Sequence, residues 1–233
     1  MLRRLVLLAG VAALVAAAPA LSITGGSLDG NAHPAVGLIL ADGGSGPAPD
    51  CTGSLVSRTV VVTAAHCVHG ATAWVTFDSH YVAGSSKLVT GTFHADPLWD
   101  PAAKDTHDLA VVVLDKPVQV QPLPLPAAGV LDVLPKDATV TNVGYGYFDR
   151  TFTFDGYRRV STSSFTSVGA SLLKLSDNPG GVCFGDSGGP RLFGGAVVAV
   201  TSTGNANCTG QSVSYRLDTQ SARSFLSGFV PVP

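Results

Sequence analysis

Between residues 35 and 217 the chain consists of short runs of β-branched or alternating apolar residues, separated by glycine and proline. Many short strands with frequent turn residues are typical of sandwiches and barrels, so the sequence predicts an all-β fold. A Gly/Pro-rich stretch, 42–49, is expected on the surface. The expected strands are 35–40, 54–57, 59–63, 73–77, 87–93, 109–114, 138–145, 157–168, 172–175, 190–193, 196–201 and 213–217.

One segment near the end of the chain has clear helical periodicity. Phe225 and Phe229 are four residues apart and fall on one helix face. Asp218 or Thr219 can cap the first turn, and Gly228 can end the last. We therefore expect a C-terminal helix at about 219–228.

The first 22 residues have the layout of a secretory signal peptide, with Arg3 and Arg4 before an apolar run that ends in small residues. The alternative is a membrane anchor, but the run is short and is broken at Pro19. Removing the leader leaves 12 of the 14 basic residues against 16 acidic ones, a net charge of about −4. We therefore expect a secreted protein that has no nucleic-acid partner and no stable membrane association after signal removal.

A glycine-rich stretch, GDSGGP at residues 185–190, surrounds Ser187 with little side-chain bulk. A serine hydroxyl is a weak nucleophile, so it needs a histidine to take its proton and a third group to orient that histidine. His66 lies in TAAHC, and Asp108 precedes an apolar run. Taken singly, the three have ordinary explanations as a turn, a structural histidine and a solvated strand end. Their conjunction indicates nucleophilic catalysis.

The residues around Ser187 also fit the G-x-S-x-G pattern of α/β-hydrolases, which indicates an esterase. In that fold the catalytic histidine follows the nucleophile and the acid along the chain. All six histidines of this chain precede Ser187, so chain order excludes the esterase fold. Those outside the candidate site, such as His69 and His107, are expected to be surface or hydrogen-bonded structural residues.

Four cysteines in an exported chain imply two disulfides, and the sequence alone permits three pairings. A zinc site that includes His66 or His69 is the alternative, although the chain has no C-x-x-C pair. We expect no metal centre and no cofactor. Calcium bound by loop carboxylates such as Asp78 or Asp96 remains an open alternative.

The blocks TAAHC, DLAV and GDSGGP, in that order, resemble those of the chymotrypsin/trypsin-like serine endopeptidases, of a secreted, bacterial type. The resemblance covers nearly all of residues 23–229 and implies two six-stranded antiparallel β-barrels of chymotrypsin type. It places the first barrel at about 23–117 and the second at about 127–217, with a Pro-rich link at 117–126. His66, Asp108 and Ser187 would form the triad where the barrels meet.

The same resemblance implies the parts that surround the triad. Backbone N–H groups of Gly185 and Ser187 would form the oxyanion hole, and the pairs Cys51–Cys67 and Cys183–Cys208 would form the disulfides. Ser202, Thr203 and Gly204 would pair with substrate backbone, although Thr203 stands where tryptophan is usual and an ordinary edge strand is the alternative. Gly181, Val182, Gly204 and Ser212 would wall a neutral pocket for small to medium apolar side chains.

In such enzymes a freed amino terminus pairs with the acid before the nucleophile, here Ile23 with Asp186. Thr24 replaces the usual aliphatic residue. A signal-peptidase cut after Ser22 would create the Ile23 terminus directly, whereas a cut after Ala20 would leave two residues ahead of it.

The sequence therefore predicts a monomeric secreted serine endopeptidase whose partners are peptide or protein substrates and protein protease inhibitors. The alternative is a catalytically silent protease-like binding protein, because fold does not fix function.

Overall fold

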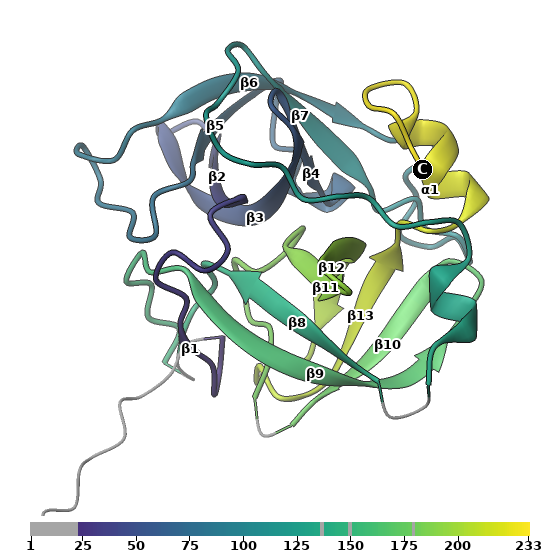
Figure 1. Cartoon of the computed structure of the whole chain (residues 1–233). Coiled ribbons are helices and arrows are strands. Elements are labelled where there is room, and N and C mark those ends of the chain that lie inside the picture. The colour runs from purple at the N-terminus through teal and green to yellow at the C-terminus, as the bar shows by residue number, and fades with distance from the viewer. Residues whose placement is uncertain (1–22, 136–137, 149–150, 179) are drawn as a thin grey trace, which may run out of the picture.

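The computed structural model describes residues 23–135, 138–148, 151–178 and 180–233. The expected leader, residues 1–22, lies outside them. The first half of the chain forms a closed antiparallel barrel in the order β2-β3-β4-β7-β6-β5, drawn in purple to blue in the upper part of Figure 1. Its strands are β2 (Val36–Asp42), β3 (Pro47–Ser57), β4 (Val60–Thr63), β5 (Thr72–Thr76), β6 (Val89–Ala95) and β7 (Ala110–Leu114).

The second half forms a barrel in the order β9-β10-β13-β12-β11-β8, and the pairing of β8 with β9 closes it. The all-β architecture of two six-stranded antiparallel barrels is thus confirmed. A short strand, β1 (Ser27–Leu28), pairs with β9, so this part of the range expected for the first barrel lies on the second. The strands are β8 (Thr139–Gly144), β9 (Arg159–Val168), β10 (Leu172–Asp177), β11 (Pro190–Phe193), β12 (Ala196–Gly204) and β13 (Gly210–Arg216).

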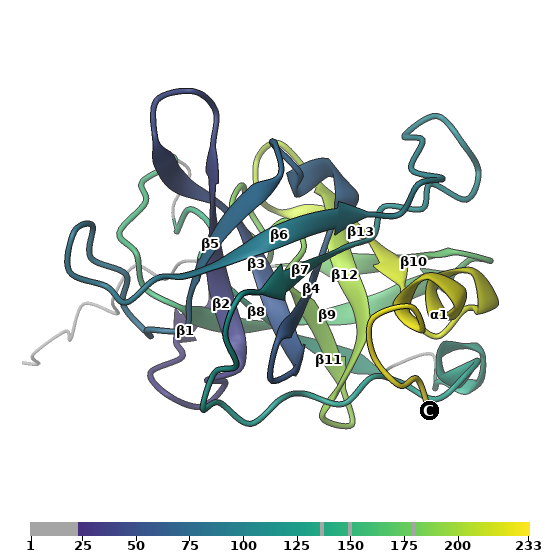
Figure 2. The ribbon, with the colours of Figure 1, turned by 90° about the horizontal axis from the view of Figure 1, so that it is seen from above.

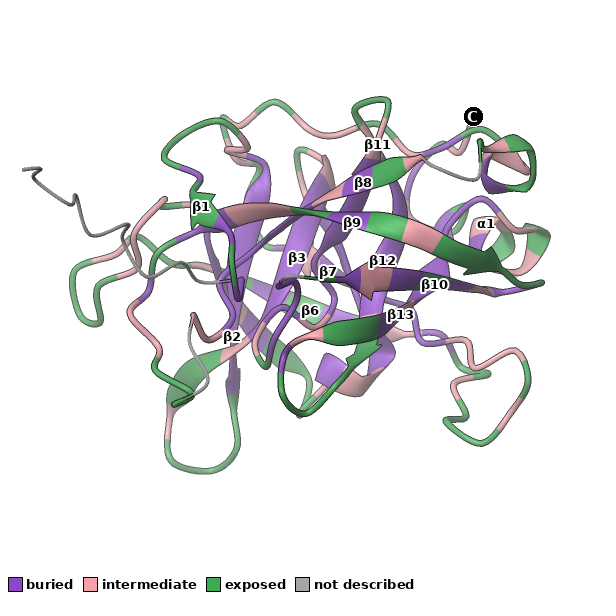
Figure 3. Ribbon diagram, turned by 90° about the horizontal axis from the view of Figure 1, so that it is seen from below, coloured by how far each residue is buried: buried purple, intermediate pink, exposed green. Residues whose placement is uncertain are grey.

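Strands β4 and β7 are buried on both faces. Their apolar runs are therefore continuous and do not alternate between apolar and polar residues. Val61 and Val112 point into the first barrel, whereas Val62 and Val111 pack against Val197 and other side chains of the second. Successive strand side chains point to opposite faces, and each fully buried valine contributes about 1.5–3 kcal/mol. Figure 3 shows buried residues along the strands between the two barrels, whereas β1 and parts of β9 and β13 are exposed, as are the projecting loops.

Strand β3 begins earlier than the sequence indicates, because its first residues lie in the Gly/Pro-rich stretch 42–49. Pro47 and Pro49 pair with β2 alone, whereas β4 joins β3 only from Ser54 onward. Prolines are tolerated where a strand has a free edge, since no partner needs their missing N–H. In Figure 2 the loop between β2 and β3 projects well beyond the barrel.

The C-terminal helix, α1 (Gln220–Leu226), begins where expected, since the Thr219 hydroxyl accepts from the Ala222 N–H at 3.3 Å. It ends at Leu226 rather than at Gly228, because Ser227 forms the C-cap. Leu226 packs into the core shared by both barrels. Two short 3-10 helices, Ala65–Cys67 and Val130–Val133, were not expected. No helix in the described part of the chain is long and apolar enough to cross a membrane.

Candidate active site

His66 lies in the 3-10 turn that follows β4, with its ring against the carboxylate of Asp108. Its Nδ1 is 2.9 Å from Oδ2 and 3.1 Å from Oδ1, and its backbone N–H donates to Oδ1 at 3.0 Å. A carboxylate accepts only, so Nδ1 carries the proton and Nε2 is left as the basic atom. This is the tautomer that a general base toward a serine requires.

Asp108 is fully buried just before β7 and accepts a further hydrogen bond from the hydroxyl of Ser202. The preceding residue, His107, has a positive φ of 49° and hydrogen-bonds Asp96 through Nδ1 at 2.9 Å. Buried charges are stable only when several donors surround them. Three donor groups, from His66 and Ser202, surround the buried side chain of Asp108.

Ser187 lies on a loop of the second barrel that is tied to the first barrel. Thr52 of β3 donates from its backbone N–H to the Ser187 carbonyl at 2.9 Å and from its hydroxyl to the Gly185 carbonyl at 2.8 Å. Gly188 has a φ of 72°, and a Cβ there would collide with the hydroxyl of Thr63. The close approach of the barrels at this point therefore requires glycine.

Ser187 and His66 line the same two pockets, so the structure brings all three expected triad residues together. No hydrogen bond joins the Ser187 hydroxyl to His66 among the described residues; such bonds are often long before substrate binds. The backbone N–H groups of Gly185 and Ser187 donate to no other described residue. They are thus available to an oxyanion.

The first of these pockets, of about 330 Å³, lies beside the end of β12. Val182 and Gly204, which were expected in the pocket wall, line it together with Ser202 and Thr203, and none of the described residues in its lining is a lysine, arginine or carboxylate. Gly181 and Ser212 are buried and are not among the described residues that line it.

A buried charged cluster that the sequence did not indicate lies behind this pocket. The Arg191 guanidinium is fully buried and donates to the hydroxyls of Ser212 and Ser214, each at 2.8 Å, and to the Asn142 side-chain oxygen at 2.5 Å. Burial lowers the pKa of Arg191, and the charges of Asp177 and Asp186 oppose this shift. The hydroxyl of Ser212, which was expected in the pocket wall, therefore accepts a hydrogen bond from Arg191 instead.

Asp186 is fully buried beneath the Ser187 loop, where it accepts from Gly146 N–H at 2.8 Å and Cys183 N–H at 2.9 Å. Burial raises the pKa of Asp186 to about 6 despite these two hydrogen bonds. Ile23 is also buried, with 1% of its surface exposed, and the Thr24 hydroxyl donates to the Cys208 carbonyl at 2.6 Å. In the full chain the Ile23 nitrogen is an amide, and no ion pair with Asp186 is formed among the described residues.

The disulfides Cys51–Cys67 and Cys183–Cys208 frame the site. The first joins β3 to the turn of His66, and the second joins the segment before Ser187 to the loop between β12 and β13. The sulfurs of Cys51 and Cys67 lie close to His66, but they are bonded to each other and offer no thiolate to a metal.

The second pocket at Ser187, of about 440 Å³, lies on the side of Gly185 and was missed by sequence reasoning. Its lining includes Asp50 and His69, whose Oδ2 and Nε2 are 3.5 Å apart. Burial raises the pKa of Asp50, while the charges of His69 and His66 lower it. The position of Asp50 directly before Cys51 is the signal that could have placed it here.

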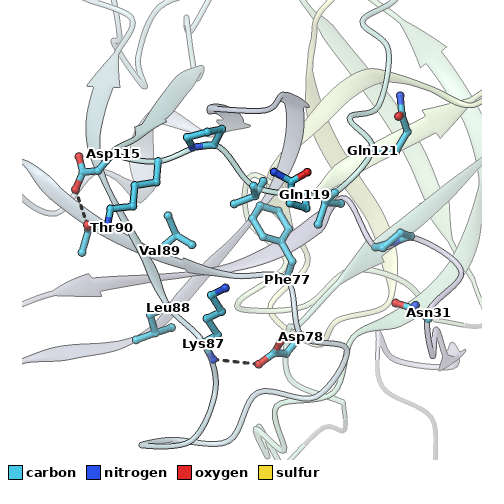
Figure 4. A pocket seen from close by; sticks show the side chains of 15 residues that line it. Asn31, Phe77, Asp78, Lys87, Leu88, Val89, Thr90, Asp115, Gln119 and Gln121 are labelled. Carbon is cyan, nitrogen blue, oxygen red and sulfur yellow. Dashed lines mark hydrogen bonds between the residues drawn. The ribbon is translucent and has the colours of Figure 1, made fainter.

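A larger cavity, about 780 Å³, lies away from the expected triad, between the β5–β6 connection and the link after β7. Figure 4 shows Phe77, Leu88 and Val89 in its wall and the hydrogen bond from Thr90 to Asp115 at one end. None of the triad residues lines it.

Comparisons with known proteins agree with this geometry. The family model described as Trypsin matches residues 25–224. A glucanase inhibitor protein 1 of Phytophthora sojae is 31% identical over 162 residues, 61% of this chain and 60% of the relative. A trypsin of Phaedon cochleariae is 29% identical over 181 residues, 66% of this chain and 68% of the relative. These relatives come from an oomycete and an insect, so they give no support to the expected bacterial type.

Solved structures show the same fold. The one described as "Atomic resolution structure of HBP" superposes with a TM-score of 0.74 at 21% identity and covers 90% of this chain and 98% of its own. "Structure of GrC" has a TM-score of 0.73 at 19% identity over 88% of this chain and 97% of its own. The matched region spans about three fifths of the length of the glucanase inhibitor relatives.

Proposed function

Because the chain belongs to the trypsin family, we propose that it is a serine endopeptidase that cuts after uncharged, small to medium apolar residues. The observation that carries this proposal is the hydrogen-bonded pair of His66 and Asp108 beside Ser187, at the junction of two pockets. The pocket beside β12 supports the uncharged preference, because a lysine or arginine side chain would lie there without a carboxylate partner.

In the proposed reaction the Ser187 Oγ bonds to the substrate carbonyl carbon while its proton passes to His66 Nε2. The backbone N–H groups of Gly185 and Ser187 hold the resulting oxyanion, an interaction worth roughly 10²- to 10³-fold in rate for one donor. When the C–N bond breaks, His66 gives this proton to the amine. Water then gives a proton to His66 Nε2 while its oxygen bonds to the acyl carbon. The bond from that carbon to Ser187 Oγ breaks and His66 returns the proton to Oγ, which frees the acid and restores Ser187.

Peptide hydrolysis tests the proposal. The mature protein should cleave peptides with Ala, Leu or Phe before the scissile bond at least tenfold faster than peptides with Arg, measured as kcat/KM. A matched Ser187→Ala variant should cleave none of them. A faster rate with Arg would contradict the pocket assignment, and equal rates with Ser187→Ala would contradict the nucleophile.

The proposed function includes secretion of the protein and removal of its leader. We propose secretion, which the two disulfides support because such bonds persist in oxidising compartments. A cut after Ser22 would turn the Ile23 amide into an ammonium group that pairs with Asp186. The burial of both residues supports this step. Amino-terminal sequencing of secreted protein should begin at Ile23; a start at Leu21 would contradict it.

A second candidate function is a protease-like binding protein without catalysis. The relatives named glucanase inhibitor proteins favour it, because a protein of this kind acts by binding another protein. In that case Ser187→Ala would bind its protein partner as well as the wild type does, and neither would cleave a peptide. We favour the peptidase because His66, Asp108 and Ser187 are all present and together.

A further inference from the structure

The two pockets at the candidate site would each bind a different part of a peptide substrate. Of the described residues, they share His66, Phe184 and Ser187 alone. The pocket beside β12 contains Ser202, Thr203 and Gly204, the strand end proposed to pair with the acyl part of a substrate. A chain that passes over Ser187 from there continues into the pocket of about 440 Å³ on the Gly185 side. This second pocket therefore receives the leaving group.

Asp50 gives the leaving-group pocket a carboxylate with free hydrogen-bonding capacity. Its Oδ2 is shielded from solvent and accepts no hydrogen bond among the described residues. His69 Nε2 is 3.5 Å away, within ion-pair distance but outside hydrogen-bond geometry, and the His69 side chain is 54% exposed. The Asp50 side chain as a whole is 30% exposed, so a ligand in the pocket can reach the carboxylate. A carboxylate oxygen without a donor is costly, so a ligand that supplies one binds favourably.

Much of the remaining lining of this pocket is aromatic. Tyr147 and Phe184 lie with ring centroids 6.4 Å apart, and Phe184 is 53% exposed. Tyr145 and Phe154 add two more rings to the lining. Long cationic side chains pack their methylene stems on such surfaces and place the charge at a carboxylate or over a ring face. No lysine or arginine is among the described residues that line the pocket, and among the described residues only His69 forms an ion pair with Asp50.

We propose that Asp50 makes this pocket a leaving-group subsite that selects lysine or arginine within the first two residues after the scissile bond. The inference rests on the proposed peptidase activity. The backbone of Asp50 is held in place, because the next residue, Cys51, is bonded to Cys67 beside His66. Charge-assisted hydrogen bonds at such a site correspond to about a 10- to 100-fold preference over a neutral side chain of the same shape.

Acyl transfer tests the subsite separately from the first half of the reaction. An N-acyl-leucine ester forms the acyl-enzyme, and added dipeptide amides compete with water for it. Arg-Ala-amide and Ala-Arg-amide are compared with their citrulline counterparts, which have the same shape and no charge. At pH 8, where an ordinary histidine is neutral, one arginine dipeptide should capture the acyl group 10- to 100-fold better than its citrulline match.

Variants assign the effect to Asp50. Asp50→Asn should abolish the arginine preference, and Asp50→Lys should favour Glu-containing dipeptides instead. Asp115→Asn is the matched control, because Asp115 lines the remote cavity of Figure 4 and its variant should keep the preference. Ester turnover without any preference for arginine, or with a preference that survives in Asp50→Asn, would overturn the inference alone. No turnover of the ester by the mature wild type would overturn the proposed function as well.

Discussion

At the scale of single residues, the proposed peptidase reaction depends strongly on the carboxylate of Asp108. Asp108→Asn should reduce kcat/KM by about 10⁴-fold, because an amide donates to Nδ1 of His66 and leaves the ring in the wrong tautomer. Ser202→Ala should cost about tenfold, since it removes one hydrogen bond to the same charge. Peptide kinetics measure both. Equal losses in the two variants would mean that the carboxylate is only a structural group.

Asp186 gives the full chain a distinctive dependence of stability on pH. Burial raises its pKa from 3.8 to about 6, so the folded chain binds this proton more tightly than the unfolded chain does. The contribution of Asp186 to the free energy of unfolding should therefore fall by about 3 kcal/mol as pH rises from about 4 to about 6. Urea unfolding of the full chain as the Ser187→Ala variant measures this slope.

Two matched proteins check the origin of the slope. Adding Asp186→Asn should remove this contribution, because the amide does not titrate in this range. A chain that begins at Ile23 should also lose it, because a freed ammonium group stabilises the ionised carboxylate. An unchanged slope in the chain that begins at Ile23 would contradict the proposed Ile23–Asp186 pair.

At the scale of elements, β3 positions the nucleophile loop from the other barrel. Thr52→Val should reduce stability by about 1–3 kcal/mol, because the Gly185 carbonyl and the Tyr145 N–H both lose the hydroxyl. Thr52→Ser keeps that hydroxyl and is the control. Urea unfolding and peptide kinetics should show both stability and kcat lowered only in the valine variant. A full kcat in Thr52→Val would show that the Thr52 hydroxyl does not help to position Ser187.

The sequence predicted those strands and helix ends that a local residue pattern specifies. It did not predict elements that form only through contacts with residues distant in the chain. Short β-branched runs between turns located most strands, and Thr219 located the helix start. Strand β1 has two residues and exists only through its pairing with β9, so no local pattern indicates it. The triad residues follow from short motifs. The motifs do not predict which residues line the pocket beside β12. Ser212 was expected there, but its hydroxyl accepts a hydrogen bond from the buried Arg191, which is distant from it in sequence.

At the scale of the whole molecule, the shared core should make the two barrels unfold together. That core contains Val62 and Leu109 of the first barrel and Val197 and Tyr215 of the second. Leu175 belongs to a cluster confined to the second half of the chain, so Leu175→Ala perturbs that barrel alone, at a cost of about 2–5 kcal/mol.

Both tryptophans, Trp74 and Trp99, lie in the first half of the chain, so their fluorescence reports on the first barrel. In Leu175→Ala the fluorescence transition in urea should shift as far as the transition in circular dichroism. A fluorescence midpoint equal to that of the wild type would show that the barrels unfold independently.

The central claim is that Ser187 is a nucleophile activated by His66, and covalent labelling tests it most directly. Mature protein treated with a sulfonyl fluoride should gain the mass of one adduct, and peptide mapping should place it on Ser187. His66→Ala should react at least 100-fold more slowly, because the serine then has no base. Absence of an adduct on protein shown to begin at Ile23, or an equal labelling rate in His66→Ala, would contradict the account.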